Sequence, residues 1–248
     1  TVTQDPLPGT ILTAGTTTVT VTASDGSFDT LCSFTIIVTD QTAPTAICQN
    51  IILPLDQNGL ASIAPTDIDF GSSDNCGSIT SSLDSTTFSC NDIGDNLVVL
   101  TITDQGGLTS TCNAMVTVVD TLAPQIFTQD IIVYLDANGE VSITPQDIDA
   151  GSTDNCGIVS YSLDATSFDC SNTGPNQVTL TLTDASANTS ASTAIVTVVD
   201  AIAPTAVCQN ITLELDASGN ASISAQDIDA GSYDNCTVGQ IAINQTNF

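Results

Sequence analysis

The stretch Asp67-Ile68-Asp69-Phe70-Gly71-Ser72-Ser73-Asp74-Asn75-Cys76 occurs in three closely similar copies in this chain of 248 residues. The other copies begin at Asp147 and Asp227, so the chain is an array of 80-residue units (147 − 67 = 227 − 147 = 80). Each copy crowds several aspartates, an asparagine and a glycine into ten residues. Because Asp and Asn bond their own backbone and Gly accepts positive φ, the stretch predicts a compact loop in every unit.

A proline-containing joint separates the units. It reads Asp40-Gln41-Thr42-Ala43-Pro44 and recurs after Asp120 and Asp200. Proline keeps so short a link extended and limits its flexibility. We therefore expect the C-terminal part of a truncated unit at 1–40, complete units at 41–120 and 121–200, and the N-terminal part of a further unit at 201–248.

Strand signals fill the complete unit 41–120. Short β-rich runs alternate with turns such as Asp56-Gln57-Asn58-Gly59, and Val98, Leu100 and Ile102 share one face of a strand. No helical period is present. The pattern predicts an all-β fold of tandem immunoglobulin-like β-sandwich repeats, one for each 80-residue unit. The expected strands lie near 46–55, 60–63, 79–83, 86–90, 97–103 and 110–119.

All the charged side chains of this chain are acidic. It has 28 acidic residues and no Lys, Arg or His, so neutralisation must come from counterions or bound metal. This charge excludes nucleic acid as an electrostatic partner. No apolar run approaches the ~20 residues of a membrane-spanning helix, so we expect no membrane span in this fragment.

Catalysis is hard to build from these residues. Without His, Lys or Arg there is neither a Ser-His-Asp arrangement nor a cationic electrophile. Asp67 and Asp74 could act as a glycosidase carboxylate pair. The same pair recurs in every unit, however, and catalytic sites are rarely repeated in this way. We therefore expect that the chain is not an enzyme.

Cysteines fall into four sets of equivalent positions when the 80-residue period is applied. Unit 121–200 has Thr128 and Ser192 where unit 41–120 has Cys48 and Cys112, and their joint loss predicts that these two cysteines pair. Zinc is the alternative role, but there is no His and no CxxC spacing. Disulfides indicate an oxidising, extracellular compartment. The predicted bridges are Cys48–Cys112, Cys76–Cys90 and Cys156–Cys170, with Cys32, Cys208 and Cys236 left over because their units are cut; Cys236 would need position 250.

Two patterns resemble a known family. The entry Pro44-x-x-x-Cys48, the central Asp74-Asn75-Cys76 and a closing pattern at 15–35 that ends Cys32-Ser33-Phe34-Thr35 look like the hyalin repeat. The longer pattern around the acidic loop resembles tandem repeats of giant cell-surface adhesins of gliding marine Bacteroidota. The resemblance covers the whole chain and implies an immunoglobulin-like fold and extracellular adhesion. Unit 121–200 departs from the hyalin pattern because it lacks the first and last cysteines.

Calcium binding is the sharpest site hypothesis. If the Asp56–Gly59 turn lies at one pole of the sandwich, the acidic loop lies at the other, beside Asp104 and the joint residue Asp40. Aspartates there would offer the roughly six to eight oxygens that Ca²⁺ prefers. The alternative is that Asp67 and Asp74 cap turns and bind water. The candidate ligands at the three junctions are Asp40, Asp67, Asp69, Asp74 and Asp104; Asp120, Asp147, Asp149, Asp154 and Asp184; and Asp200, Asp227, Asp229 and Asp234.

The tiled unit favours a structural role. We expect a stalk or fibre segment of a large secreted cell-surface adhesin, stiffened by disulfides and Ca²⁺. The alternative is a ligand-binding adhesion module of a surface filament, for a glycan or a protein. Expected partners are other repeats of the same chain and a homo-oligomeric bundle or filament, at an extracellular or cell-surface location.

Overall fold

The computed structural model describes residues 1–247 and divides into two compact units, Thr1–Thr121 and the part that begins at Leu122. Both are built from β-strands, and each contains one complete two-layered sandwich. The all-β, immunoglobulin-like fold expected from the sequence is therefore confirmed.

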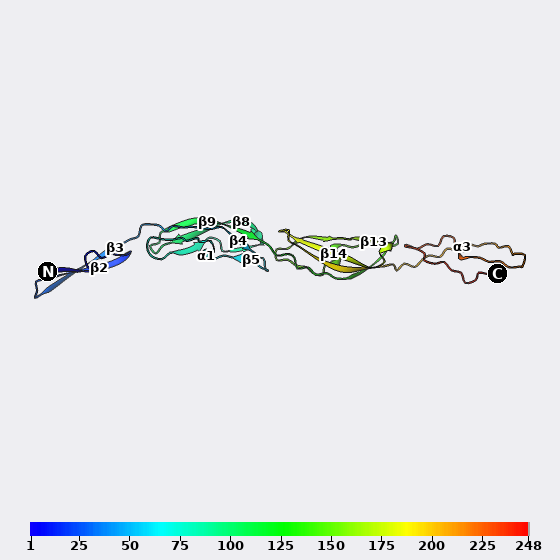
Figure 1. Ribbon diagram of the computed structural model, residues 1–248, viewed down its shortest axis with the longest axis horizontal. Coiled ribbons are helices and arrows are strands. Elements are labelled where there is room, and N and C mark those ends of the chain that lie inside the picture. The colour runs from blue at the N-terminus through cyan, green and yellow to red at the C-terminus, as the bar shows by residue number, and fades with distance from the viewer. Residues whose placement is uncertain (248) are drawn as a thin grey trace. The chain divides into compact units, whose positions relative to one another are not determined.

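The complete sandwich of the first unit has a four-stranded and a two-stranded sheet. The four-stranded sheet has the order β4-β9-β8-β6, with β4 parallel to β9, and the two-stranded sheet pairs β5 with β7. In Figure 1 the long strands β8 and β9 lie along one layer, and α1 and β5 along the other. The elements are β4 (Ile51–Pro54), β5 (Leu60–Ser62), α1 (Pro65–Ile68), β6 (Thr80–Leu83), β7 (Thr87–Ser89), η1 (Cys90–Asp92), β8 (Gly94–Thr103) and β9 (Thr109–Val119).

Alternation along the two long strands builds the core. Val98, Leu100 and Ile102 of β8 are fully buried, and so are Val116 and Val118 of β9. A strand points successive side chains to opposite faces, so this period of two buries one face and leaves threonines on the other. The opposite layer contributes Ile63, Ile68 and Phe88, and Leu55 adds to the core from the end of β4.

Strand register separates the two ends of this sandwich. Thr80 pairs with Thr103, which places the start of β6 beside the end of β8. Leu60 pairs with Ser89, which carries the chain to the Asp56–Gly59 turn at the other end. We call these ends the acidic pole, which holds residues 72–77 and 104–108, and the turn pole, which holds residues 56–59 and η1.

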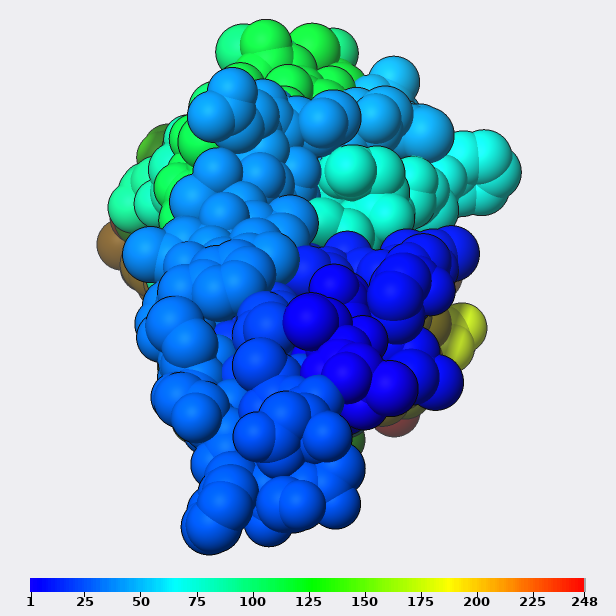
Figure 2. Space-filling model, turned by 90° about the vertical axis from the view of Figure 1, so that its left-hand side faces the viewer, coloured from blue at the N-terminus to red at the C-terminus, as the bar shows by residue number. Residues whose placement is uncertain are grey.

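Residues 1–40 form a separate antiparallel sheet in the first unit. Its strands are β1 (Val2–Asp5), β2 (Gly15–Ser24) and β3 (Asp29–Val38), and Figure 2 faces it in shades of blue. Phe34 is exposed here, whereas its counterpart Ala114 in β9 is fully buried. Residues 1–40 thus form a single sheet, in which Val19, the register partner of Phe34, is buried.

The second unit repeats the sandwich. Thr128 Oγ1 lies 3.1 Å from Ser192 Oγ, so a hydrogen bond stands where the first unit has its Cys48–Cys112 disulfide. Its sheets have the orders β10-β15-β14-β12 and β11-β13. The elements are β10 (Ile131–Tyr134), β11 (Glu140–Ser142), α2 (Pro145–Ile148), β12 (Ile158–Leu163), β13 (Ser167–Asp169), η2 (Cys170–Asn172), β14 (Gly174–Asp184) and β15 (Thr189–Val199).

The last part of the described chain contains the acidic loop without long strands. It includes α3 (Ala225–Ile228), and isolated bridges join Thr205 to Tyr233 and Cys208 to Asp229. Leu215 is 64% exposed, whereas the equivalent Leu55 is 4% exposed. The loop therefore forms locally, without the long strands of a complete sandwich.

Candidate functional site: an acidic junction between repeats

The first two aspartates of the repeated stretch hold the loop in shape. Asp67 Oδ2 accepts a hydrogen bond of 2.7 Å from Ala64 N and closes the first turn of α1. Asp69 Oδ1 accepts one of 3.0 Å from Ser72 N. The loop therefore begins with a helical turn that the sequence did not predict, started by Pro65 at a position that needs no amide donor.

The same two roles recur in the later copies. Asp147 Oδ2 accepts from Thr144 N at 2.7 Å and Asp227 Oδ2 from Ser224 N at 2.8 Å. Asp149 and Asp229 accept from the serine amides three residues later. The structure thus uses these aspartates in local turns and does not group them with the other candidate ligands.

The third aspartate reaches the joint between repeats. Ligand atoms of Asp74, Asp40 and Cys76 all lie within 4.8 Å of one another. Asp74 Oδ2 accepts from Cys76 N at 3.0 Å, and its Oδ1 is buried without a hydrogen-bond partner. Cys76 Sγ donates to Asp40 Oδ2 at 2.9 Å. Asp40 follows β3 and Asp74 lies in the acidic loop before β6, so the group joins the end of the N-terminal sheet to the complete sandwich.

Asp104 borders this group at the end of β8. Its side chain is 6% exposed; Oδ1 accepts from Leu108 N at 2.8 Å, while Oδ2 is buried without a partner. A Cβ atom added to Gly106 would lie 3.3 Å from Asp104 Oδ1 and 4.0 Å from Asp40 Cβ, so the two aspartates flank this glycine. We call Asp40, Asp74, Cys76 and Asp104 the junction cluster.

Electrostatics of the junction cluster keep the thiol protonated. Its hydrogen bond to Asp40, its burial and the charges of the three aspartates raise the pKa of Cys76 to about 11. The same thiol, together with Thr42 N, lowers the pKa of Asp40. Asp40 thus accepts a hydrogen bond from a protonated thiol, and no Lys, Arg or His is present to offset the remaining carboxylates.

In the second unit, Asp154 and Asp184 approach each other in the same way. Their ligand atoms lie within 4.8 Å, and Asp184 is 2% exposed at the end of β14. Asp184 Oδ1 accepts from the amides of Ser186 and Asn188, and Asp154 Oδ1 is buried without a partner. Asp120, which follows β9 in the first unit, is also buried.

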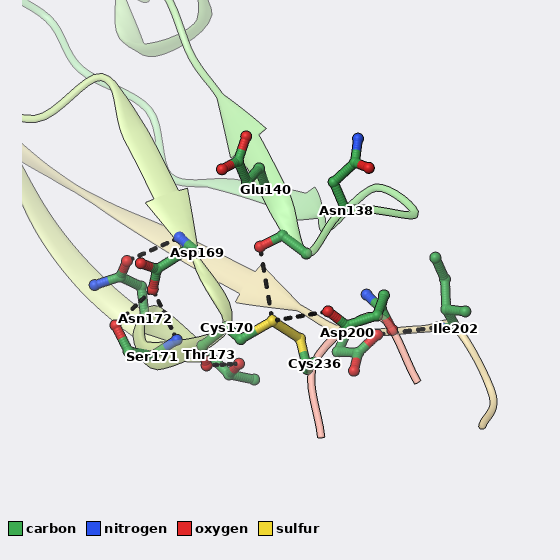
Figure 3. The surroundings of a disulfide bond; sticks show 12 residues. Asn138, Glu140, Asp169, Cys170, Ser171, Asn172, Thr173, Asp200, Ile202 and Cys236 are labelled. Carbon is green, nitrogen blue, oxygen red and sulfur yellow. Dashed lines mark hydrogen bonds between the residues drawn. A yellow bond between two sulfur atoms is a disulfide. The ribbon is translucent and has the colours of Figure 1, made fainter. Parts of the chain in front are cut away.

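A disulfide joins η2 to the acidic loop in the last part of the described chain. Cys170 of η2 bonds to Cys236, 66 residues later (Figure 3). Asn235 Nδ2 donates to Asp136 O at 3.1 Å, which adds a hydrogen bond between the same repeats. Asp200 lies beside this disulfide in Figure 3, and Asp234 Oδ1 is buried without a partner.

Two of the three predicted disulfides are wrong. The structure contains Cys48–Cys112, but Cys170 bonds to Cys236 and not to Cys156, and Cys76 is a free thiol and not the partner of Cys90. Cys90 and Cys156 are themselves disulfide-bonded. The predicted partners stand at opposite poles: Cys76 lies beside Asp40, whereas Cys90 Sγ lies 3.7 Å from Gly59 O. Of the expected leftovers, Cys32 and Cys208 are free and Cys236 is not.

Gly139 is a junction residue that sequence reasoning missed. An added Cβ would lie 2.6 Å from Cys170 Sγ and 2.7 Å from Asn235 O, and its φ is +76°. The glycine therefore lets both the disulfide and the backbone of the next repeat approach the turn. Only the turn signal at 136–139 could have pointed to it, and that signal says nothing of a neighbouring repeat.

No protein-family model and no curated protein matches this chain. Similar solved structures include a protocadherin gammaB7 EC3-6 cis-dimer (18% identity over 83% of this chain and 62% of that chain, TM-score 0.32) and Drosophila N-cadherin EC1-4 (13%, 77% and 60%, TM-score 0.35). An endo-fucoidan hydrolase of glycoside hydrolase family 107 is similar at 16% identity, over 76% of this chain and 34% of that chain, with a TM-score of 0.25. The chain spans about a third to three-fifths of the length of these proteins. At such identities the likeness concerns the β-sandwich fold alone.

Among the residues that the structure describes, no helix has the length and apolar character needed to cross a bilayer.

Proposed function

We propose that the chain is a structural stalk or fibre segment of a large extracellular cell-surface adhesin. The observation that carries this proposal is the Cys170–Cys236 disulfide, which ties one repeat covalently to the next. A catalytic or ligand-binding domain has no need of such a tie, whereas an array that transmits tension does. Disulfides also favour an oxidising, extracellular location. We further propose repeat boundaries at 1–40, 41–120, 121–200 and 201–248.

The hyalin-like motifs support an adhesive rather than a catalytic role. We propose no enzymatic activity, because the sequence has no His, Lys or Arg to serve as a base or a cationic electrophile. The partners we propose are the other repeats of the same chain and further copies in a bundle or filament. Tyr134 and Tyr233 are exposed, and they lie far apart in the sequence.

Calcium at the repeat junctions is the second part of the proposal. Asp104 Oδ2 and Asp74 Oδ1 are buried without hydrogen-bond partners, a costly state for a carboxylate. Together with Asp40 they offer the hard oxygen ligands that Ca²⁺ prefers. A bound ion would compensate these oxygens and join Asp40 of one repeat to Asp74 and Asp104 of the next. Asp154 and Asp184 fit an equivalent role in the second unit.

Calcium titration by calorimetry, with melting curves, tests this part. We expect the double variant Asp74→Asn, Asp104→Asn to bind one Ca²⁺ fewer per chain than the parent. At a hundred times the dissociation constant, binding to the folded state alone adds about 2.7 kcal/mol to stability. The variant should lose the share of this stabilisation that belongs to the first junction.

A matched control removes the same charge elsewhere. Asp29→Asn with Asp95→Asn changes two exposed aspartates outside the junction cluster and should keep the full stoichiometry. Identical melting curves in chelator and in millimolar calcium would show that the carboxylates are only a solvated acidic surface.

A further inference from the structure

Cys76 differs from its two equivalents in keeping a free thiol. Cys156 and Cys236 are disulfide-bonded, and Cys236 bonds to a cysteine 66 residues earlier. The residue 66 positions before Cys76 is Thr10 (76 − 66 = 10), which carries no sulfur. The thiol is therefore available at this junction as a metal ligand, although the chain has no His and no CxxC spacing.

The surroundings of this thiol are those of a metal ligand. Cys76 Sγ lies 2.9 Å from Asp40 Oδ2. The ligand atoms of Cys76, Asp40 and Asp74 all lie within 4.8 Å of one another. A tetrahedral Zn²⁺ with bonds of about 2.3 Å to sulfur and about 2.0 Å to oxygen holds such ligands roughly 3.5 Å apart. The spacing thus accommodates the ion with small side-chain movements.

Asp104 provides an independent observation that favours a bound cation. Its side chain is more than nine-tenths buried, Oδ2 has no hydrogen-bond partner, and its charge acts on Cys76. A buried carboxylate oxygen without a donor is destabilising unless a cation compensates it. Asp40 and Asp104 flank the same glycine, and the charge of Asp104 acts on Cys76, so the Asp104 carboxylate borders the cluster.

We propose that Cys76, Asp40 and Asp74 bind a thiophilic divalent cation such as Zn²⁺ or Cd²⁺, with Asp104 as the fourth anionic group. This deepens the proposed calcium role, because it rests on the same carboxylates at the same junction. On binding, the cation bonds to Sγ and the thiol proton passes to solvent, so charge and atoms balance. Ca²⁺ takes oxygen ligands and does not recruit the sulfur, whereas thiolate selects Zn²⁺ and similar ions. Beside Asp154 and Asp184 the equivalent cysteine, Cys156, is disulfide-bonded, so it offers no thiol to a cation.

The test uses the full chain with Cys32→Ser and Cys208→Ser, so that Cys76 is the single free thiol. Titration with Cd²⁺ should produce a sulfur-to-cadmium charge-transfer band in the ultraviolet that saturates at one ion per chain. Zn²⁺ should slow the reaction of Cys76 with a disulfide reagent at least tenfold, and a chelator should restore the rate. Cys76→Ser should abolish the band, and Asp40→Asn or Asp74→Asn should weaken cadmium binding at least tenfold.

Controls separate this inference from the calcium proposal. Asp95→Asn should leave cadmium binding unchanged, and Cys76→Ser should leave calcium stoichiometry unchanged, so either metal can fail without the other. The proposal is overturned if no band forms at millimolar Cd²⁺, if the band survives Asp40→Asn and Asp74→Asn at full affinity, or if Cys76 is found oxidised in an intermolecular disulfide in freshly purified protein.

Discussion

Aspartates within one repeat perform two different tasks in this chain. Asp67 and Asp69 accept amide hydrogens within their own loop, so their charge is satisfied locally. Asp74 and Asp104 leave one oxygen each buried and unpartnered. The difference comes from position, since the first pair lies in and after a helical turn and the second pair lies at the acidic pole. Composition alone could not have separated them.

Gly139→Ala tests whether the close approach of Cys170 Sγ and Asn235 O to the turn requires a glycine. We expect it to destabilise the second unit by about 2–4 kcal/mol, because the methyl group would meet Cys170 Sγ and Asn235 O in addition to the strain of positive φ. Thermal unfolding measures the loss, and peptide mapping measures the fraction of Cys170–Cys236 formed.

Gly219→Ala is its matched control. Gly219 has a similar φ of +80° in the equivalent turn, but nothing lies within 4 Å of its Cβ position. It should cost only the conformational strain, about 1–2 kcal/mol, and leave the disulfide intact. Equal losses for the two variants would show that the close approach has no energetic weight.

At the scale of elements, the sandwich was predictable and the loop only in part. Alternation in β8 predicted that Val98, Leu100 and Ile102 share one face, and all three are buried, because a strand has a fixed period of two. The helical turn α1 was missed because four residues give no helical period. Asp40, Asp74 and Asp104 were placed at one pole from strand directions alone, and the structure brings them together there. Asp67 and Asp69 were added to them because sequence does not show which carboxylates are already bonded to amides.

Acid should loosen the loop. Hydrogen bonds from the Ser72 side chain and amide lower the pKa of Asp69, and Ser232 acts likewise on Asp229. A depressed folded-state pKa contributes stability that is present above the unfolded value of 3.8 and is lost as pH falls below it. Urea unfolding from pH 5 to pH 2 should therefore show a fall that begins near 3.8. Ser72→Ala with Ser232→Ala should make this fall shallower, and an unchanged pH profile would contradict the assignment.

The pair Thr128 and Ser192 offers a test of strand closure. Their hydroxyl groups occupy the place of the Cys48–Cys112 disulfide. Thr128→Cys with Ser192→Cys should form a disulfide without reductant and stabilise the second unit by about 4 kcal/mol in the chain-entropy model for a loop of this length. Melting curves with and without reductant measure the gain, and Thr128→Ala with Ser192→Ala should instead lose about 1 kcal/mol. A cysteine pair that stays reduced would show that the two segments are held too far apart.

At the scale of the whole chain, the 80-residue repeat does not show whether a cysteine bonds to a nearby cysteine or to the equivalent cysteine one repeat away. Cys156 and Cys236 are equivalent, so the 80-residue period allows Cys170 to pair either back to Cys156 (170 − 156 = 14) or forward to Cys236 (236 − 170 = 66). The period identifies the classes of cysteine that pair but not which copy supplies the partner. Strand register decides it, because the chain crosses from the acidic pole to the turn pole between Cys156 and Cys170. The pairing Cys48–Cys112 was predictable because both residues vanish together from one unit.

A pulling force on the chain should therefore not load the joint at Asp200–Pro204, which lies between the two bonded cysteines. Cys170 and Cys236 are 66 residues apart in sequence and joined by one bond, so force passes from one to the other and the segment between them carries no load. In single-molecule pulling, replacing both with serine should lengthen the unfolded chain by about 230 Å, at about 3.5 Å for each residue released. If Cys170 instead bonded to Cys156, the gain would be only about 50 Å.

Cys48→Ser with Cys112→Ser provides the control. This variant should lengthen the unfolded chain about as much as the loss of Cys170–Cys236 does, because the Cys48–Cys112 disulfide joins residues 64 positions apart. Observation of the smaller gain would restore the connectivity within the repeat and remove the covalent tie on which the stalk proposal rests.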